Sequence, residues 1–229
     1  MTVSFIVAFF IVGLLLGASH LIVGKEVVFA HFAVFLISAA TSAVLLYFDR
    51  RSLKHRVSRL LPELAAGVRS NGAVALVALC IPLGVFGTFY WGLTGPKTIT
   101  NGVAIKSALA NAPLFLWIGK AATIVLLVPF AEEMFYRGYV WDRLSTAMTP
   151  VLVGAISAAL FLAAHVLNGI AYPLYVLPIT AILTAIRLQG VGLSMCLLAH
   201  VLYNAVNVLG TFVQVHDGVF RALIAGSSQ

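Results

Sequence analysis

Two acidic side chains stand next to each other in an apolar stretch of this chain, at Glu132 and Glu133. An ionised carboxylate in the hydrocarbon of a membrane costs ~2.5–3.5 kcal/mol on the mildest scale, and two adjacent carboxylates also repel each other. Chains keep such residues mainly for chemistry or transport. The chemistry open to a carboxylate beside an imidazole is the deprotonation of a water molecule.

Further polar residues follow in later apolar stretches. They are Arg137, His165, His200, Asn204 and Asn207. Polar side chains in membrane helices usually face the interior of the bundle and find partners there. We therefore expect the three helices that carry these residues to meet. Together they offer a carboxylate, two imidazoles and amides, which suits hydrolysis: one imidazole assists the carboxylate, and the other donors stabilise an oxyanion.

The spacing divides the two glutamates. Residues four apart share a helix face, whereas adjacent residues diverge by about 100°. Glu133 and Arg137 are therefore expected to form an ion pair, and Glu132 points elsewhere and can face a cavity. The same spacing pairs His200 with Asn204. It also places Phe161 one turn before His165, so that the two rings pack together.

Other chemistries have less support. The chain has no H-E-x-x-H metalloprotease motif and no G-x-S-x-G around a serine, and no Asp lies in an apolar span. A glutamate with two histidines could still bind Zn²⁺, so a zinc-dependent protease remains an alternative. A proton-coupled transporter also uses buried Glu and His, but no inverted repeat is visible. A non-catalytic membrane scaffold is a further alternative.

Composition indicates a membrane protein. Of 229 residues, 62% are hydrophobic and 9% charged, with a mean hydropathy of +1.07, whereas soluble domains carry about 25% charged residues. The net charge of +7 is explained by basic cytoplasmic loops, so no nucleic-acid partner is expected. Cys80 and Cys196 lie in apolar runs and read as small core residues.

The predicted fold is all-α and polytopic, with about seven transmembrane helices and at most eight. The expected spans are 3–23, 27–48, 72–93, 113–136, 150–168, 171–188 and 191–213. A loop over 49–70, with six Lys or Arg against two Asp or Glu, is placed in the cytoplasm together with the N-terminus. Residues 94–112 are expected to form an extramembrane loop or a short interfacial helix, and an eighth helix is expected to be either missing or reduced to 219–225.

Three motifs in order resemble a known family. Glu132-Glu133-x-x-x-Arg137, Phe161-x-x-x-His165 and His200-x-x-x-Asn204 are similar to the motifs of the CAAX protease and bacteriocin-processing (CPBP, or Abi) family, which includes type II CAAX prenyl endopeptidases. The resemblance covers about 128–210. It implies a single transmembrane domain over 1–229, with variable N-terminal helices over 1–112 and catalytic core helices over 113–213.

The resemblance also implies an intramembrane glutamic endopeptidase that needs no metal or cofactor, with a water-filled cavity open to the cytoplasm. Glu132 and His165 would activate water, and His200 and Asn204 would stabilise the oxyanion. Supporting roles fall to Glu133, Arg137 and Phe161. The substrates would be peptides or membrane proteins, either prenylated CAAX proteins or bacteriocin and signal peptides. The protein itself would lie in a prokaryotic plasma membrane. Bacteriocin self-immunity without catalysis is the alternative within the family.

Overall fold

A computed structural model describes residues 50–94, 114–166 and 172–226 of the chain. Within those residues every element is helical and none is a strand, which agrees with the all-α prediction. The first two expected spans and the 94–112 segment, but for its first residue, lie outside the described residues. The predicted total of seven transmembrane helices is therefore not confirmed.

Two of the described helices are long and apolar enough to cross a bilayer. They are α4 (Asn71–Thr94), over Asn71–Thr88, and α11 (Leu193–Gly226), over Leu193–Gln214. Two shorter apolar helices, α9 (Pro150–His165) and α10 (Tyr172–Leu188), match the expected fifth and sixth spans. Residues 219–225 belong to α11 and form no separate eighth helix.

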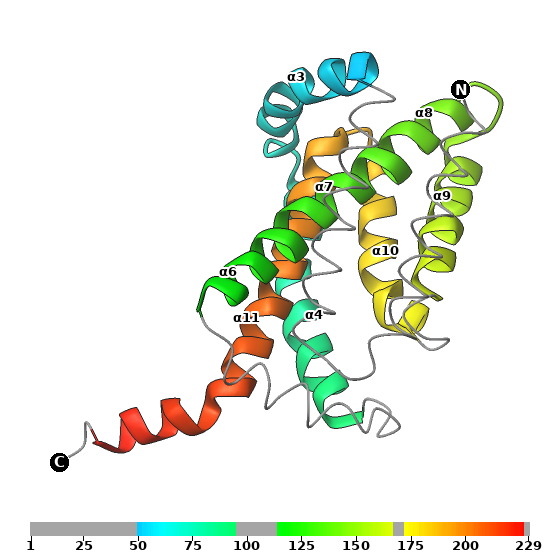
Figure 1. The fold of residues 1–229 in the computed structure, drawn as a ribbon. Helices are drawn as coiled ribbons and strands as arrows, with labels where there is room; N and C mark the ends of the chain where they lie inside the picture. Colours follow the sequence, from blue (N-terminus) through cyan, green and yellow to red (C-terminus); the bar gives the residue numbers. More distant parts are fainter. Residues whose placement is uncertain (1–49, 95–113, 167–171, 227–229) are drawn as a thin grey trace, which may run out of the picture.

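The fourth expected span runs further than predicted. It is a continuous run of α6 (Leu114–Ala121), η1 (Ala122–Leu127), α7 (Val128–Glu132), η2 (Glu133–Val140) and α8 (Trp141–Leu144), in which η1 and η2 are π-helical. The run crosses the front of the bundle in Figure 1. The helix continues past 136, where the expected apolar span ended, because the charged Arg137 is buried with its partners.

The charged 49–70 segment is a helix and not a loop. Helix α3 spans Arg50–Gly67 and lies across one end of the bundle (Figure 1). Its prediction as a loop overlooked a helical face, because Arg56, Leu60, Glu63 and Gly67 recur at helical spacing and are all at least partly buried. A charged segment with that spacing can pack on a bundle if its buried charges find partners.

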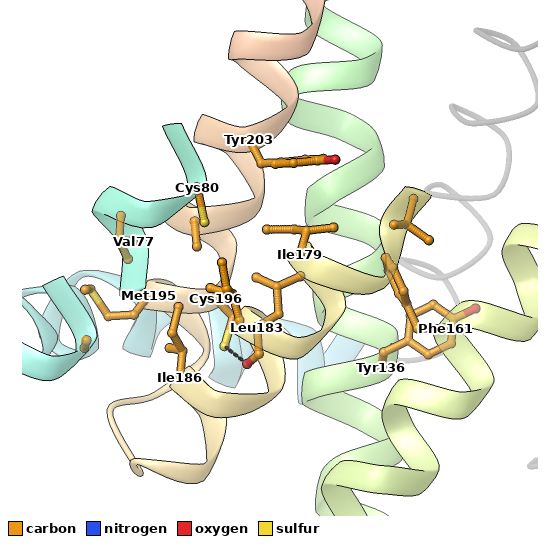
Figure 2. Packing of buried hydrophobic residues seen from close by; sticks show 14 residues of the cluster. Val77, Cys80, Tyr136, Phe161, Ile179, Leu183, Ile186, Met195, Cys196 and Tyr203 are labelled. Carbon is orange, nitrogen blue, oxygen red and sulfur yellow. Dashed lines mark hydrogen bonds between the residues drawn. The ribbon is translucent and has the colours of Figure 1, made fainter. Parts of the chain in front are cut away.

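The core lies where α4, α10 and α11 meet, with Tyr136 of η2 and Phe161 of α9 on its flank (Figure 2). Both cysteines belong to this core, and the Cys196 thiol donates to the Leu183 carbonyl at 3.4 Å. Helices α10 and α11 are joined by a tight turn in which Gly190 and Gly192 have φ of 72° and 95°. Only glycine takes such angles without strain, so the two helices can run back side by side.

Large apolar side chains also cover the outside of the helices. Leu79 and Phe86 on α4, Leu174 on α10 and Leu209 on α11 are exposed by 47%, 63%, 73% and 63%. Soluble proteins seldom expose large contiguous apolar surface, whereas lipid tails cover it at no cost in a bilayer. The outward side chains therefore fit helices surrounded by lipid.

Candidate active site

The adjacent glutamates lie at a change of helix type. Glu132 is the last residue of α7, and Glu133 is the first residue of the π-helix η2. π-Helical turns are rare, with N–H(i+5)→O=C(i) hydrogen bonds, and occur frequently at functional sites. Here two π-helical segments flank the five residues of α7, so the backbone that carries the glutamates departs from α-helical geometry on both sides.

Glu133 is completely buried, and one of its two carboxylate oxygens binds an arginine and a histidine. Its Oε1 accepts a hydrogen bond from Arg137 Nη1 at 3.1 Å and lies 2.8 Å from His200 Nδ1, and the side chains of Glu133 and Arg137 are both 0% exposed. The expected ion pair is therefore present. The Arg137 guanidinium lies 4.3 Å from the centre of the Phe161 ring, which adds a cation–π contact. Glu133 thus joins η2 to α11, and its partner Arg137 adds the contact with α9.

Glu132 has a different environment. Its side chain retains 24% exposure, and its Oε2 lies 3.6 Å from His200 Nε2. That distance exceeds a direct hydrogen bond, and a slight approach of the two side chains would form one. The Glu133 carboxylate can only accept a hydrogen bond, so the proton between the two groups belongs to His200 Nδ1. The His200 ring lies between the two carboxylates, with its Nε2 turned toward Glu132.

His165 is held at the end of α9. Its Nδ1 lies 2.8 Å from the Phe161 carbonyl, so Nδ1–H donates there and the lone pair of the neutral ring is on Nε2. The ring stacks parallel to Tyr172, with an interplanar angle of 2° and centroids 5.8 Å apart. It also contacts Phe161 at 4.5 Å, as the spacing predicted. Phe161 in turn meets the His200 ring edge-on at 5.9 Å and separates the two histidines.

Asn204 connects α11 to η1. Its Nδ2 donates to the Ile124 carbonyl at 2.8 Å. In the π-helical pattern the donor to that carbonyl would be the N–H at position 129, and Pro129 has none. Asn204 therefore replaces a hydrogen bond that the chain cannot make locally. An amide NH₂ group carries two N–H donors, so one remains for another acceptor.

Three residues that the sequence did not single out bind the backbone of η2. Arg56 Nη1 donates to the Met134 carbonyl at 3.2 Å, Ser157 Oγ to the Tyr136 carbonyl at 3.0 Å, and Arg187 Nε to the Arg137 carbonyl at 3.1 Å. The two arginines also flank Asp142 at 3.2 and 3.5 Å. Irregular backbone in a membrane persists only where such partners satisfy it, so these side chains fix η2 and with it the glutamates.

Asn207 lies apart from this group. Its Oδ1 accepts hydrogen bonds from Tyr175 at 2.6 Å and Thr88 at 3.0 Å, and its Nδ2 donates to the Tyr203 carbonyl at 2.8 Å. The residue thus joins α4, α10 and α11. Of the motif residues, Glu132, Glu133, Arg137 and His200 come together, whereas His165 contacts Phe161 and Tyr172, and Asn204 binds η1. Phe161 touches both Arg137 and His200, so the expected meeting of the three helices is confirmed.

A known protein family matches the segment that carries these residues. Residues 113–206 match the family model described as type II CAAX prenyl endopeptidase Rce1-like. This segment is similar to Rce1-like domains. The match confirms the resemblance carried by the three motifs, and the segment contains every motif residue from Glu132 to Asn204. No curated protein and no solved structure matches the chain.

The Rce1-like match points to a membrane endopeptidase. Among the described residues, no three His, Cys, Asp or Glu side chains gather in an arrangement that could hold a metal ion. The matched segment contains the carboxylates of Glu132 and Glu133, the imidazoles of His165 and His200, and the amide of Asn204.

Proposed function

We propose that the protein is an intramembrane glutamic endopeptidase that hydrolyses peptide bonds near the cytoplasmic membrane face. In this proposal Glu132, with His165, takes a proton from a water molecule, and the resulting hydroxide attacks the carbonyl carbon of the scissile bond. The tetrahedral intermediate collapses when the proton passes to the leaving amine, which yields a free carboxylate and amine. No covalent intermediate is formed.

The difference between the two glutamates carries this proposal. Glu133 has no exposed surface and is held by Arg137 and His200, whereas the Glu132 side chain is 24% exposed. A general base must reach a water molecule, and a fully buried, paired carboxylate cannot. Of the pair, only Glu132 meets this condition.

Asn204 and His200 can both donate a hydrogen bond to an oxyanion, but His200 needs a second ring proton to do so. Asn204 keeps a second N–H after its bond to Ile124. His200 uses Nδ1–H on Glu133, so donation from Nε2 to an oxyanion requires a proton on each ring nitrogen.

The test uses purified full-length protein and a quenched fluorescent peptide ending in a farnesylated CAAX sequence. The same peptide without the farnesyl group and a bacteriocin-type leader peptide are run beside it. Cleavage of the farnesylated peptide alone would assign a CAAX-type substrate, and cleavage of the leader peptide would assign precursor processing. Glu132→Gln and His165→Ala are expected to lose cleavage at least about 100-fold, the lower range of general acid–base contributions.

His216→Ala is the matched control for His165→Ala. His216 also has a phenylalanine four residues before it, with Nδ1 2.9 Å from the Phe212 carbonyl and ring centroids 4.3 Å apart. Its neighbours differ, because the Trp117 ring lies beside His216, whereas the Tyr172 ring stacks on His165. Loss of activity in both histidine variants, or full activity in folded Glu132→Gln, would contradict the proposal.

The metal-independent mechanism is tested separately. Activity of the purified protein is measured after dialysis against EDTA and 1,10-phenanthroline, and again after addition of Zn²⁺. We expect unchanged cleavage throughout. Cleavage that disappears with chelator and returns with Zn²⁺ would establish the zinc-dependent alternative instead.

A further inference from the structure

Helix α3 is fixed to the bundle by one side only. On that side Arg56 pairs with Asp142 at 3.2 Å, and Glu63 Oε2 accepts a hydrogen bond from the Leu193 N–H at 2.8 Å. A Cβ on Gly67 would clash with the Met195 side chain, so the last turn of α3 is in close contact with α11. These contacts define the orientation of the helix about its own axis.

The opposite side of α3 carries two kinds of exposed residue. Val57, Leu61 and Val68 are exposed by 44%, 77% and 52%, and at 100° per residue they fall within about 40° of one another. The next side of the helix is basic and exposed. It consists of Lys54, His55, Arg59 and Arg69. Single exposed apolar residues are common, but a stripe of three beside a basic face is the pattern of a helix that lies in a membrane interface.

The location of α3 agrees with that pattern. The helix lies across the end of the bundle at which α11 begins (Figure 1). A helix at that end has lipid headgroups beside it when α4 and α11 cross the bilayer. Its apolar stripe can then reach the acyl chains while its basic side faces the phosphates.

We propose that α3 lies in the membrane–water interface and preferentially binds anionic phospholipid headgroups of the bilayer that surrounds the protein. Charge complementarity identifies the occupant. Within the described part of α3 and the turn after it, Lys54, Arg59 and Arg69 are exposed cations, and Glu63, the acidic residue there, is turned inward to Leu193 and Arg59. The exposed charges on this surface are therefore all positive. The proposal is independent of catalysis.

The lipid preference is tested in detergent-purified full-length protein reconstituted into nanodiscs of equal phosphatidylglycerol and phosphatidylcholine. The nanodiscs are then stripped of bulk lipid, and the retained lipids are counted by mass spectrometry. The wild-type protein should retain phosphatidylglycerol preferentially. Each of Lys54→Gln and Arg69→Gln should reduce that preference, with an affinity loss of about fivefold per charge removed.

Arg143→Gln is the matched control, since Arg143 is an exposed cation on α8 that lies over the Tyr139 ring and outside α3. It should leave the preference unchanged. An equal loss in this variant would show attraction by net charge alone, and an unchanged preference in the α3 variants would remove the lipid site; either result overturns the proposal.

The depth of α3 in the bilayer can be measured independently of its lipid preference. A nitroxide attached at Leu61→Cys should be more accessible to oxygen than to a water-soluble nickel complex, and one at Lys54→Cys should show the reverse. The buried positions of Cys80 and Cys196 keep the label on the introduced cysteine. A Leu61 label that is fully accessible to nickel would place α3 in water, where it could meet an acidic protein but not the bilayer, and would refute the interfacial location.

Discussion

Removal of the charge on Glu133 should destabilise the protein far more than removal of the charge on Glu132. Glu133→Gln preserves the shape of the side chain but leaves the Arg137 guanidinium, which is 0% exposed, without a counter-ion. Breaking a buried ion pair in this way costs about 3–5 kcal/mol. Glu132 is 24% exposed and has its His200 neighbour at 3.6 Å, so Glu132→Gln should cost less than about 1 kcal/mol.

The free energy of unfolding is measured by titrating the protein with SDS in mixed micelles and following tryptophan fluorescence. Peptide cleavage is measured on the same preparations. Glu132→Gln should remain folded and inactive, whereas Glu133→Gln should lose both stability and activity. The two variants have identical chemistry and adjacent positions, and each therefore serves as the control for the other.

The double variant Glu133→Leu/Arg137→Met distinguishes the contribution of the ion pair to stability from that of the buried side-chain volume. Replacement of a buried pair by apolar residues of similar volume is often neutral or stabilising, so most of the loss caused by Glu133→Gln should be recovered. Two results would contradict this expectation: a free energy of unfolding of Glu133→Gln within about 1 kcal/mol of the wild-type value, or an equal loss of stability in Glu132→Gln.

Three further changes test other contacts of the site and the core. Asn204→Ala should destabilise the protein by about 1–3 kcal/mol in the same titration, because the η1 carbonyl that Asn204 satisfies is left unpaired; an unchanged midpoint would contradict this role. Gly67→Ala should also destabilise the protein, since its Cβ would clash with Met195 of α11, whereas Gly119→Ala has open space and should be neutral or stabilising. Cys80 and Cys196 are buried, so the folded protein should resist a maleimide reagent until SDS unfolds it, as followed by the mass of the labelled protein.

The parts of the site that depend on local spacing could be predicted from the sequence. The Glu133–Arg137 pair and the Phe161–His165 contact follow from the four-residue repeat of a helix, and both are present. The meeting of three helices followed from the cost of leaving polar groups in lipid. These inferences needed no knowledge of how distant segments are arranged.

Contacts between distant segments could not be predicted in this way. The expected oxyanion pair did not anticipate that His200 would lie between two carboxylates or that Asn204 would bind η1, since both depend on how α11 is rotated against α7. Arg56 and Ser157 looked like a loop cation and a small helix residue, yet both donate to η2. The π-helices left one trace, the missing N–H of Pro129, which acquires meaning only beside the Asn204 amide.

The π-helix η2 makes the length of the chain between the glutamates and α8 a constraint in itself. Each π-helical ring encloses one residue more than an α-helical ring, so η2 can be viewed as an α-helix that has accepted an insertion. Deleting a single residue between Arg137 and Trp141 would allow normal α-helical bonding but would rotate the following helix by about 100°. Asp142 would then leave Arg56 and Arg187. Among descendants of this chain, a gain or loss of one residue in this short stretch should be rarer than a substitution there.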